Sequence, residues 1–262
     1  MSSGTVVVSK SGGVTRLTLN RPDKLNALCH ELGVTLTAAL MEAERAHDCR
    51  VVVLTGAGRG FCAGQELSDE VYVEDGPQPS LADVLDRYNP IIETIRRMPK
   101  PVIGAVNGVA AGAGASLALA CDIVLAKRSA TFLQAFSRIG LVPDCGSTWL
   151  LPRLIGEARA RAHAMLAEPI KADQAEAWGM IWKAVDDDAF DGEVTAMAER
   201  LASAATFALG LQKEAFAHSA GNDLAEQLEV EKLLQVKAAG SADFVEGVRA
   251  FQGKRAAKFE GR

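Results

Sequence analysis

The sequence predicts an α/β fold, and three features of the 262-residue chain support that prediction. Residues 50–55 and 102–106 form short apolar runs rich in β-branched side chains, which is typical of strands buried on both faces. Glycine-rich turns and stretches with helical periodicity follow these runs. Beyond residue 147, helical patterns follow one another, and only residues 182–185 resemble a strand. We therefore expect one domain, with an α/β core and a helical extension toward the C-terminus.

The first part of the chain alternates predicted strands and helices. Residues 5–20 predict a hairpin that turns at Gly12-Gly13, because glycines between two apolar runs suit a tight turn. Residues 29–47 predict a helix with leucines along one stripe, and a second helix is expected over residues 81–97. The segment 70–80 contains a glycine and two prolines, so it is the best candidate for a mobile loop.

The rest of the chain is organised around the stretch from residue 101 to residue 126. It begins as a buried strand over 102–106 and then passes through a run of small residues over 110–116. A helical pattern at 117–120 and a strand over 122–126 follow. Small side chains between a strand and a helix let other groups approach the backbone closely and leave N–H groups uncovered. Such groups could hold a phosphate, or an oxygen that gains negative charge during a reaction.

The C-terminal part of the chain is expected to be almost entirely helical. It is too thin for a large core of its own, so we expect it to pack on the α/β part or on a neighbouring subunit. We assign residues 1–200 to the core and residues 201–262 to the helical C-terminal region. Helical patterns occupy residues 148–155, 157–167, 172–180, 190–204, 207–219, 223–239 and 242–251.

Composition and charge exclude several classes of protein. The net charge is −5, from 28 basic and 33 acidic residues, so neither nucleic acid nor a membrane surface is an expected partner. Five cysteines lie scattered with no CxxC pair, which predicts reduced thiols. The first residues lack the pattern of an export signal, and no apolar run reaches membrane-spanning length. We expect a cytoplasmic protein.

The glycine-rich turns favour none of the common nucleotide motifs. Gly58-x-Gly60-x-x-Ala63 follows a strand and matches a dinucleotide fingerprint formally, but Pro77 and Pro79 follow it and no second βα unit does. A dinucleotide-binding oxidoreductase is therefore the least favoured hypothesis. The sequence has no P-loop motif, no G-x-S-x-G motif and no histidine spacing suited to a metal, and we expect no metal site.

Two glycine- and alanine-rich turns remain, each after a buried strand, and together they could give two backbone N–H donors to one oxygen. From Val6 onward the sequence resembles the enoyl-CoA hydratase/isomerase (crotonase) family. Within the family, it is most similar to members that isomerise ring-1,2-epoxyphenylacetyl-CoA in phenylacetate degradation. The resemblance implies a crotonase-like spiral of repeated ββα units and a homotrimer or a dimer of trimers. It is carried by residues 20–27 (NRPDKLNA), 54–65 (LTGAGRGFCAGQ), 100–108 (KPVIGAVNG), 121–124 (CDIV), 140–149 (GLVPDCGSTW) and 250–255 (AFQGKR).

The resemblance implies that the N–H groups of Gln65 and Ala113 polarise a thioester carbonyl. Removing a proton next to a thioester leaves an enolate oxygen, and donors aimed at it contribute roughly 3–4 kcal/mol apiece. A helix that opens near Ala113 would add its dipole. The alternative is that these small residues merely pack a helix against a strand.

The expected catalytic residue is Asp144. Family hydratases use two glutamates, and the matching positions here hold Ser116 and Phe136, neither of which can transfer the proton. Asp144 matches a third position, used by members that move double bonds, and one carboxylate suffices for isomerisation. Apolar neighbours such as Phe136, Leu141, Val142 and Trp149 should raise its pKa by desolvation. The alternative is that Asp144 caps a helix starting near Ser147.

Other side chains have weaker assignments. Ser116, Phe132, Phe136 and Trp149 could line an acyl pocket for an aromatic or ring-derived group, although aromatic residues at such spacing are often plain core. The carboxylates that rank after Asp144 are Glu66, Asp69 and Glu70, next to the first donor turn.

Coenzyme A is expected as part of the substrate, with no separate cofactor. The resemblance implies that backbone groups of five residues contact the adenine and the pantetheine arm of coenzyme A. It also implies that two lysines reach the phosphates, often from a neighbouring subunit. The alternative for Lys258 is a solvated basic tail. The five residues that contact the adenine and pantetheine are Lys24, Leu25, Ala27, Ala63 and Gln65, and the two lysines are Lys254 and Lys258.

The leading hypothesis is an acyl-CoA isomerase that acts through Asp144 on 1,2-epoxyphenylacetyl-CoA-like or 3-enoyl-CoA substrates. An enoyl-CoA hydratase of fatty-acid β-oxidation and a non-catalytic acyl-CoA-binding member of the family are the alternatives.

Overall fold

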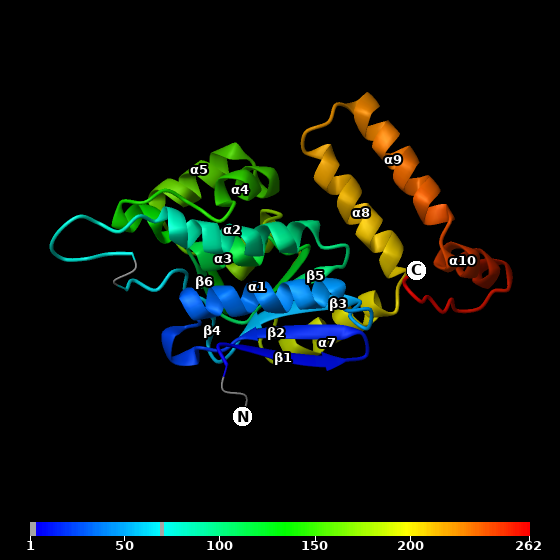
Figure 1. Cartoon of the computed structure of the whole chain (residues 1–262), viewed down its shortest axis with the longest axis horizontal. Coiled ribbons are helices and arrows are strands. Elements are labelled where there is room, and N and C mark those ends of the chain that lie inside the picture. The colour runs from blue at the N-terminus through cyan, green and yellow to red at the C-terminus, as the bar shows by residue number, and fades with distance from the viewer. Residues whose placement is uncertain (1–3, 69–70) are drawn as a thin grey trace.

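The computed structural model describes residues 4–68 and 71–262, and it contains two β-sheets. The larger sheet has six strands in the order β1-β2-β3-β5-β7-β10, and the smaller has four in the order β4-β6-β8-β9 (Figure 1). The strands are β1 Val6–Ser11, β2 Val14–Leu19, β3 Val51–Gly56, β4 Gly60–Cys62, β5 Val102–Val106, β6 Val109–Ala111, β7 Ile123–Lys127, β8 Thr131–Leu133, β9 Ile170–Lys171 and β10 Lys183–Val185.

The core is built from repeated units of two strands and a helix. In three successive units the first strand joins the larger sheet (β3, β5, β7) and the second joins the smaller one (β4, β6, β8). Within each sheet these strands run parallel. The helices that follow are α2 Ala82–Arg97, α3 Ala113–Leu119 and, after the 3₁₀ helix Ala135–Ile139, α4 Ser147–Ile155. The chain therefore winds as the expected spiral of ββα units.

The larger sheet is covered on both faces, as the apolar strands require. Along β3, Val52 and Leu54 face a core shared with α1 (His30–Arg45), whereas Val51 and Val53 face α7 (Phe190–Ala202). All four valine and leucine side chains are fully buried. Successive side chains of a strand point to opposite faces, so a strand between two helical layers must be apolar throughout.

The smaller sheet is the part of the fold that the sequence patterns did not predict. Its strands β4, β6, β8 and β9 are only two or three residues long. The glycine-rich turn after β3 and the small residues after β5 each contribute a strand, β4 and β6. The expected helix at 117–120 also begins earlier, at Ala113.

Three helices at the C-terminus extend away from the core as an arm: α8 Thr206–Ser219, α9 Leu224–Ala239 and α10 Ala242–Gln252 (Figure 1). No residue of α9 is buried, and large apolar side chains are exposed along the arm at Phe216, Leu233 and Phe251. Between α4 and the arm lie α5 Glu157–Leu166, α6 Ala172–Ala177 and α7.

Polar side chains attach the arm to the core at two points. The Lys213 ammonium of α8 lies 2.7 Å from the Asp122 carboxylate and donates to the carbonyl of Ile95 at 2.6 Å. The Arg50 guanidinium, next to the start of β3, donates to the carbonyls of Ala204 (2.6 Å) and Phe259 (2.9 Å).

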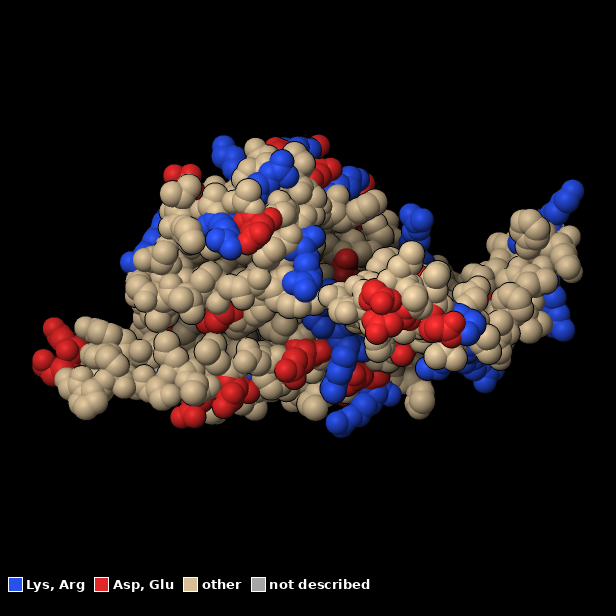
Figure 2. All heavy atoms as spheres, turned by 90° about the horizontal axis from the view of Figure 1, so that it is seen from above, with Lys and Arg blue, Asp and Glu red and all other residues tan. Residues whose placement is uncertain are grey.

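The surface carries both signs of charge. Figure 2 shows Lys and Arg side chains interspersed with Asp and Glu over the face it presents. All five cysteines are free thiols. In residues 4–68 and 71–262, no helix is long and apolar enough to cross a membrane.

Candidate active site

The segment before α1 lies against the turn that follows β4. The Ala63 N–H donates to the carbonyl of Leu25 at 3.0 Å, and the Leu28 N–H donates to the carbonyl of Gly64 at 2.7 Å. The segment that holds Lys24, Leu25 and Ala27 thus lies beside Ala63 and Gln65, and the coenzyme A assignment of these residues stays a prediction. Leu25 and Asn26 have positive φ angles of 48° and 57°, and the buried Asn26 side chain donates to the carbonyls of Ala57 and Gly60.

The two glycine-rich turns meet at Gly64. Its φ is +89°, and a Cβ atom there would lie 2.8 Å from the Ala111 oxygen and 3.5 Å from the Ala113 nitrogen. A Cβ at Gly114 would lie 2.2 Å from the Cys62 oxygen, so a side chain at either position would push the turns apart. Because Gly64 and Gly114 have no side chains, the backbone around Gln65 can lie next to the start of α3.

The N–H groups of Gln65 and Ala113 are the expected donors to the thioester oxygen. Ala113 is the first residue of α3, so its N–H has no partner within the helix. Across the described residues, no protein oxygen accepts a hydrogen bond from either N–H. The neighbouring Glu66 N–H is used, because it donates to the Leu28 carbonyl at 2.9 Å.

The Gln65 side chain is held by a residue that the sequence patterns did not single out. The Tyr88 hydroxyl of α2 donates to Gln65 Oε1 at 2.5 Å, and Gln65 Nε2 donates to the Glu66 carbonyl at 2.9 Å. Tyr88 is 2% exposed. It is one of several polar residues on helices, and nothing in its spacing indicates a partner on the donor turn.

Asp144 opens a tight turn just before α4. Its carbonyl accepts from the Ser147 N–H at 3.0 Å, and the two residues between, Cys145 and Gly146, have φ angles of 48° and 81°. The side chain does not cap α4, so that alternative is wrong. Asp144 Oδ1 is buried and has no hydrogen-bond partner within the described part of the chain. Burial raises the pKa of the Asp144 carboxyl, and the Cys145 thiol offsets part of this.

A chain of buried polar side chains lies behind this turn. Ser116 of α3 is fully buried, and its Oγ lies 3.1 Å from the Asp144 carbonyl and 2.5 Å from Ser147 Oγ. Ser147 Oγ in turn lies 3.3 Å from Gln134 Oε1. Ser116 was expected in an acyl pocket, and that assignment stays a prediction. The links to Ser147 and Gln134 were not foreseen.

The three aromatic residues expected in an acyl pocket lie in different environments. Phe136 is buried, and its ring lies 3.8 Å from where a Cβ atom would stand at Gly112, next to Ala113. Phe132 is fully buried on β8. Trp149 is 42% exposed, and its ring centroid is 4.0 Å from the Arg153 guanidinium. Phe136 is therefore the one with a contact beside a candidate donor. Of the other apolar residues expected near Asp144, Leu141 and Val142 are exposed.

Glu66 is engaged in an ion-pair network. Its carboxylate lies 2.6 Å from the Arg21 guanidinium and 3.4 Å from the Lys24 ammonium. Arg21 chiefly, with Lys24, lowers the pKa of Glu66, which makes it a poor general base. Asp69 and Glu70 lie outside the described residues.

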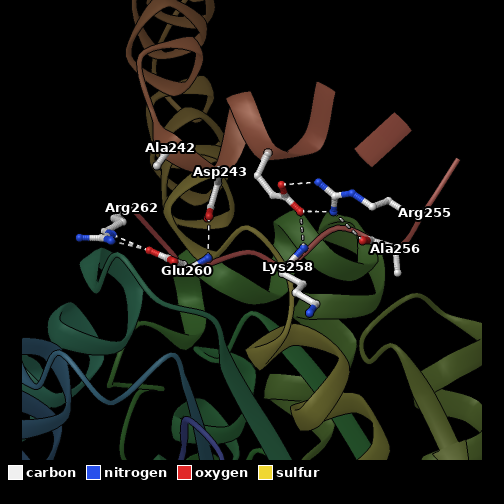
Figure 3. Close-up of a pocket in the computed structure, with 8 residues that line it drawn as sticks. Ala242, Asp243, Arg255, Ala256, Lys258, Glu260 and Arg262 are labelled. Atoms are coloured by element: carbon white, nitrogen blue, oxygen red, sulfur yellow. Dashed lines mark hydrogen bonds and ion pairs between the residues drawn. The ribbon is translucent and has the colours of Figure 1, made fainter. Parts of the chain in front are cut away.

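The two lysines expected at the coenzyme A phosphates lie after α10. Lys254 and Lys258 are exposed, and in the described ranges no hydrogen bond or ion pair joins either of them to the donor turns. Around them, Glu246 pairs with Arg255 at 2.6 and 2.8 Å, and the buried Asp243 accepts from the N–H of Glu260. These residues line a hollow beneath α10, and the Lys258 side chain projects away from the network (Figure 3).

The described residues contain no group of three or more His, Cys, Asp or Glu side chains that could hold a metal ion.

Comparison with known proteins decides the family. The model of the enoyl-CoA hydratase/isomerase family matches residues 9–262. The chain belongs to that family. The 1,2-epoxyphenylacetyl-CoA isomerase of Escherichia coli (strain K12) is 50% identical over 251 residues, which are 95% of this chain and 96% of the relative. A Rhodobacter capsulatus protein named "Probable enoyl-CoA hydratase" is 46% identical over 263 residues, which are 100% of both chains.

Solved structures of the enoyl-CoA hydratase/isomerase family have the same fold. An enoyl-CoA hydratase from Polaromonas sp. JS666 superposes with a TM-score of 0.90 at 35% identity, covering 98% of this chain and 100% of that structure. The resemblance found in the sequence and the crotonase-like fold are thereby confirmed.

Proposed function

We propose that this family member is an acyl-CoA isomerase in which Asp144 transfers a proton and the N–H groups of Gln65 and Ala113 hold the thioester oxygen. The observation that carries the proposal is a half-buried carboxyl group with one buried, unpaired oxygen, close to the helix that begins with one of the two N–H groups that lack a partner in the described residues. A raised pKa suits a residue that must both take and return a proton.

The chemistry follows for a 3-enoyl-CoA. The Asp144 carboxylate removes a proton from C2, and the electron pair of the broken C–H bond moves onto the thioester oxygen. The enolate oxygen accepts hydrogen bonds from Gln65 and Ala113, which are fixed before the charge develops. The Asp144 carboxylic acid then gives the proton to C4. The carbonyl re-forms, and the double bond now lies between C2 and C3.

The substrate class is part of the proposal. The E. coli relative, 50% identical, is a 1,2-epoxyphenylacetyl-CoA isomerase, which favours a ring-derived acyl group and a role in phenylacetate catabolism. The buried Phe136 ring beside Gly112 suits such a group. Coenzyme A would lie along Lys24, Leu25, Ala27, Ala63 and Gln65, with Lys254 and Lys258 at its phosphates.

Hydration is the second candidate, because relatives are named as enoyl-CoA hydratases. Ser116 and Phe136, which occupy the two expected glutamate positions, argue against it, since neither can activate water. Assaying crotonyl-CoA hydration beside 3-enoyl-CoA isomerisation separates the two. Hydration as the faster reaction, abolished by Ser116→Ala, would refute the isomerase proposal.

Asp144→Asn is the direct test. We expect kcat for isomerisation to fall about 10²–10⁴-fold, the usual contribution of general acid–base catalysis. The control is Asp186→Asn, an exposed carboxylate paired with Arg128, which should leave kcat unchanged. Because burial raises the pKa of Asp144, the wild-type rate should rise with pH through a midpoint above the ordinary carboxyl range. Normal acyl-CoA binding by a wild type that catalyses neither reaction would instead indicate a non-catalytic member.

We also propose that the arm forms part of a trimer interface and closes the coenzyme A site. Large exposed apolar side chains along α8, α9 and α10 support this, because a monomeric protein seldom exposes so many of them on one surface. Light scattering of the purified protein tests it, and a monomeric mass would contradict it.

A further inference from the structure

The turn that carries Asp144 needs support from outside itself. Cys145, at φ 48°, and Gly146, at φ 81°, are consecutive residues in the left-handed region. A non-glycine residue there is strained and persists only where the surroundings hold it. The turn's own hydrogen bond, from the Ser147 N–H to the Asp144 carbonyl, supplies part of that support.

The second hydrogen bond to the Asp144 carbonyl comes from Ser116. Each hydroxyl has one proton, and Ser147 Oγ can give its proton to Ser116 Oγ at 2.5 Å or to Gln134 Oε1 at 3.3 Å. The shorter contact is the stronger one. When Ser147 donates to Ser116, the proton of Ser116 is left for the carbonyls of Asp144 (3.1 Å) and Gly112 (3.2 Å).

Ser116 therefore joins the two halves of the site. It lies on α3 three residues after Ala113, whose N–H is one of the two candidate donors. Its Oγ reaches the main chain of the residue that would carry the proton. We propose that Ser116 is a positioning residue, which holds the Asp144 turn at a fixed place relative to the oxyanion donors; this inference rests on the proposed function. Ser116 has no exposed surface and acts only through Asp144.

Ser116→Ala and Ser147→Ala form a matched pair. Both remove one buried hydroxyl from the same cluster, but only the first removes a hydrogen bond to the Asp144 carbonyl. For Ser116→Ala we expect kcat to fall about tenfold or more, because small misplacements of a reacting group are costly, while KM changes less than about twofold. The acidic limb of the kcat–pH profile should move to lower pH, because a freed carboxylate gains water. Ser147→Ala should leave the limb in place.

Equal kinetic effects of the two variants, or an unshifted acidic limb in Ser116→Ala, would overturn the inference. Ser116→Cys provides a second measurement if the alanine variant unfolds. A thiol is a weaker donor of nearly the same shape, so its kcat should lie between wild type and a tenfold loss. A wild-type kcat in Ser116→Cys would overturn the inference as well. Asp144→Asn distinguishes failure of the proposed function from failure of the positioning role. Full activity of Asp144→Asn refutes the proposed function. Loss of activity in Asp144→Asn, together with wild-type activity in Ser116→Ala, refutes only the positioning role.

Discussion

Replacing Gly64 by alanine would disturb the donor pair without removing either N–H group. The new Cβ atom would stand 2.8 Å from the Ala111 oxygen and 3.5 Å from the Ala113 nitrogen. The first distance is shorter than a carbon–oxygen contact allows, and the obstacle is main chain, which cannot rotate away. The turn after β4 and the start of α3 must therefore separate by several tenths of an ångström, and Gln65 moves with Gly64.

Two costs follow, and they appear in different measurements. Alanine at φ +89° is strained by about 1–2 kcal/mol, which lowers the free energy of unfolding. Misplacing one oxyanion donor removes about 2.7–4 kcal/mol of transition-state stabilisation, so kcat should fall about 10²–10³-fold. The loss in rate should exceed anything that the loss of stability explains.

The hairpin glycine Gly12 supplies the control. Its φ is +58°, and a Cβ there meets nothing within 4 Å. Gly12→Ala should therefore show the strain in urea unfolding and full isomerase activity. Steady-state kinetics with a 3-enoyl-CoA, measured on both variants at a temperature where each is folded, gives the comparison. If Gly64→Ala keeps wild-type kcat, the donor pair is not where the oxygen binds.

Two further predictions concern stability. Lys213→Met removes the ammonium partner of the Asp122 carboxylate, whose side chain is 20% exposed, and should lower the free energy of unfolding in urea by about 1.5–3 kcal/mol, whereas Lys10→Met, at a more exposed pair, should not change it measurably. Burial lowers the pKa of His163 below its ordinary 6.5, so the unfolded chain takes up a proton first and stability should fall as the pH drops below that value. His163→Leu should flatten this decline, and an unchanged slope between about pH 7.5 and 5.5 would contradict the assignment.

The strands of the larger sheet could be predicted because their patterns are long. β3, of six residues, begins with four consecutive apolar side chains, and β5 has five residues that are all apolar or glycine; few other structures accommodate such runs. β4 and β6 have three residues each, too few to show a period of two, and they form because the ββα spiral brings their backbones side by side. A local pattern cannot indicate a pairing that depends on the whole spiral.

The residues of the candidate site also differ in whether the sequence indicates them. Gln65 and Ala113 follow glycine-rich turns that stand out in the sequence, and Asp144 stands out through the family resemblance. Tyr88 and Ser147 contribute through contacts between segments far apart in the chain. A single polar residue on a helix carries no periodic signal, so only the folded chain identifies its partner.

The Arg50 guanidinium holds the chain where the arm begins, at Ala204, and where it returns after α10, at Phe259. One side chain thus closes the whole helical loop, as a disulfide closes a loop in an extracellular protein, but without a covalent bond. Unlike a disulfide, these hydrogen bonds exist only while the arm is attached, so they stabilise the attached state and do not restrict the detached one. Replacing Arg50 would therefore remove a hydrogen bond at each end of the arm at once.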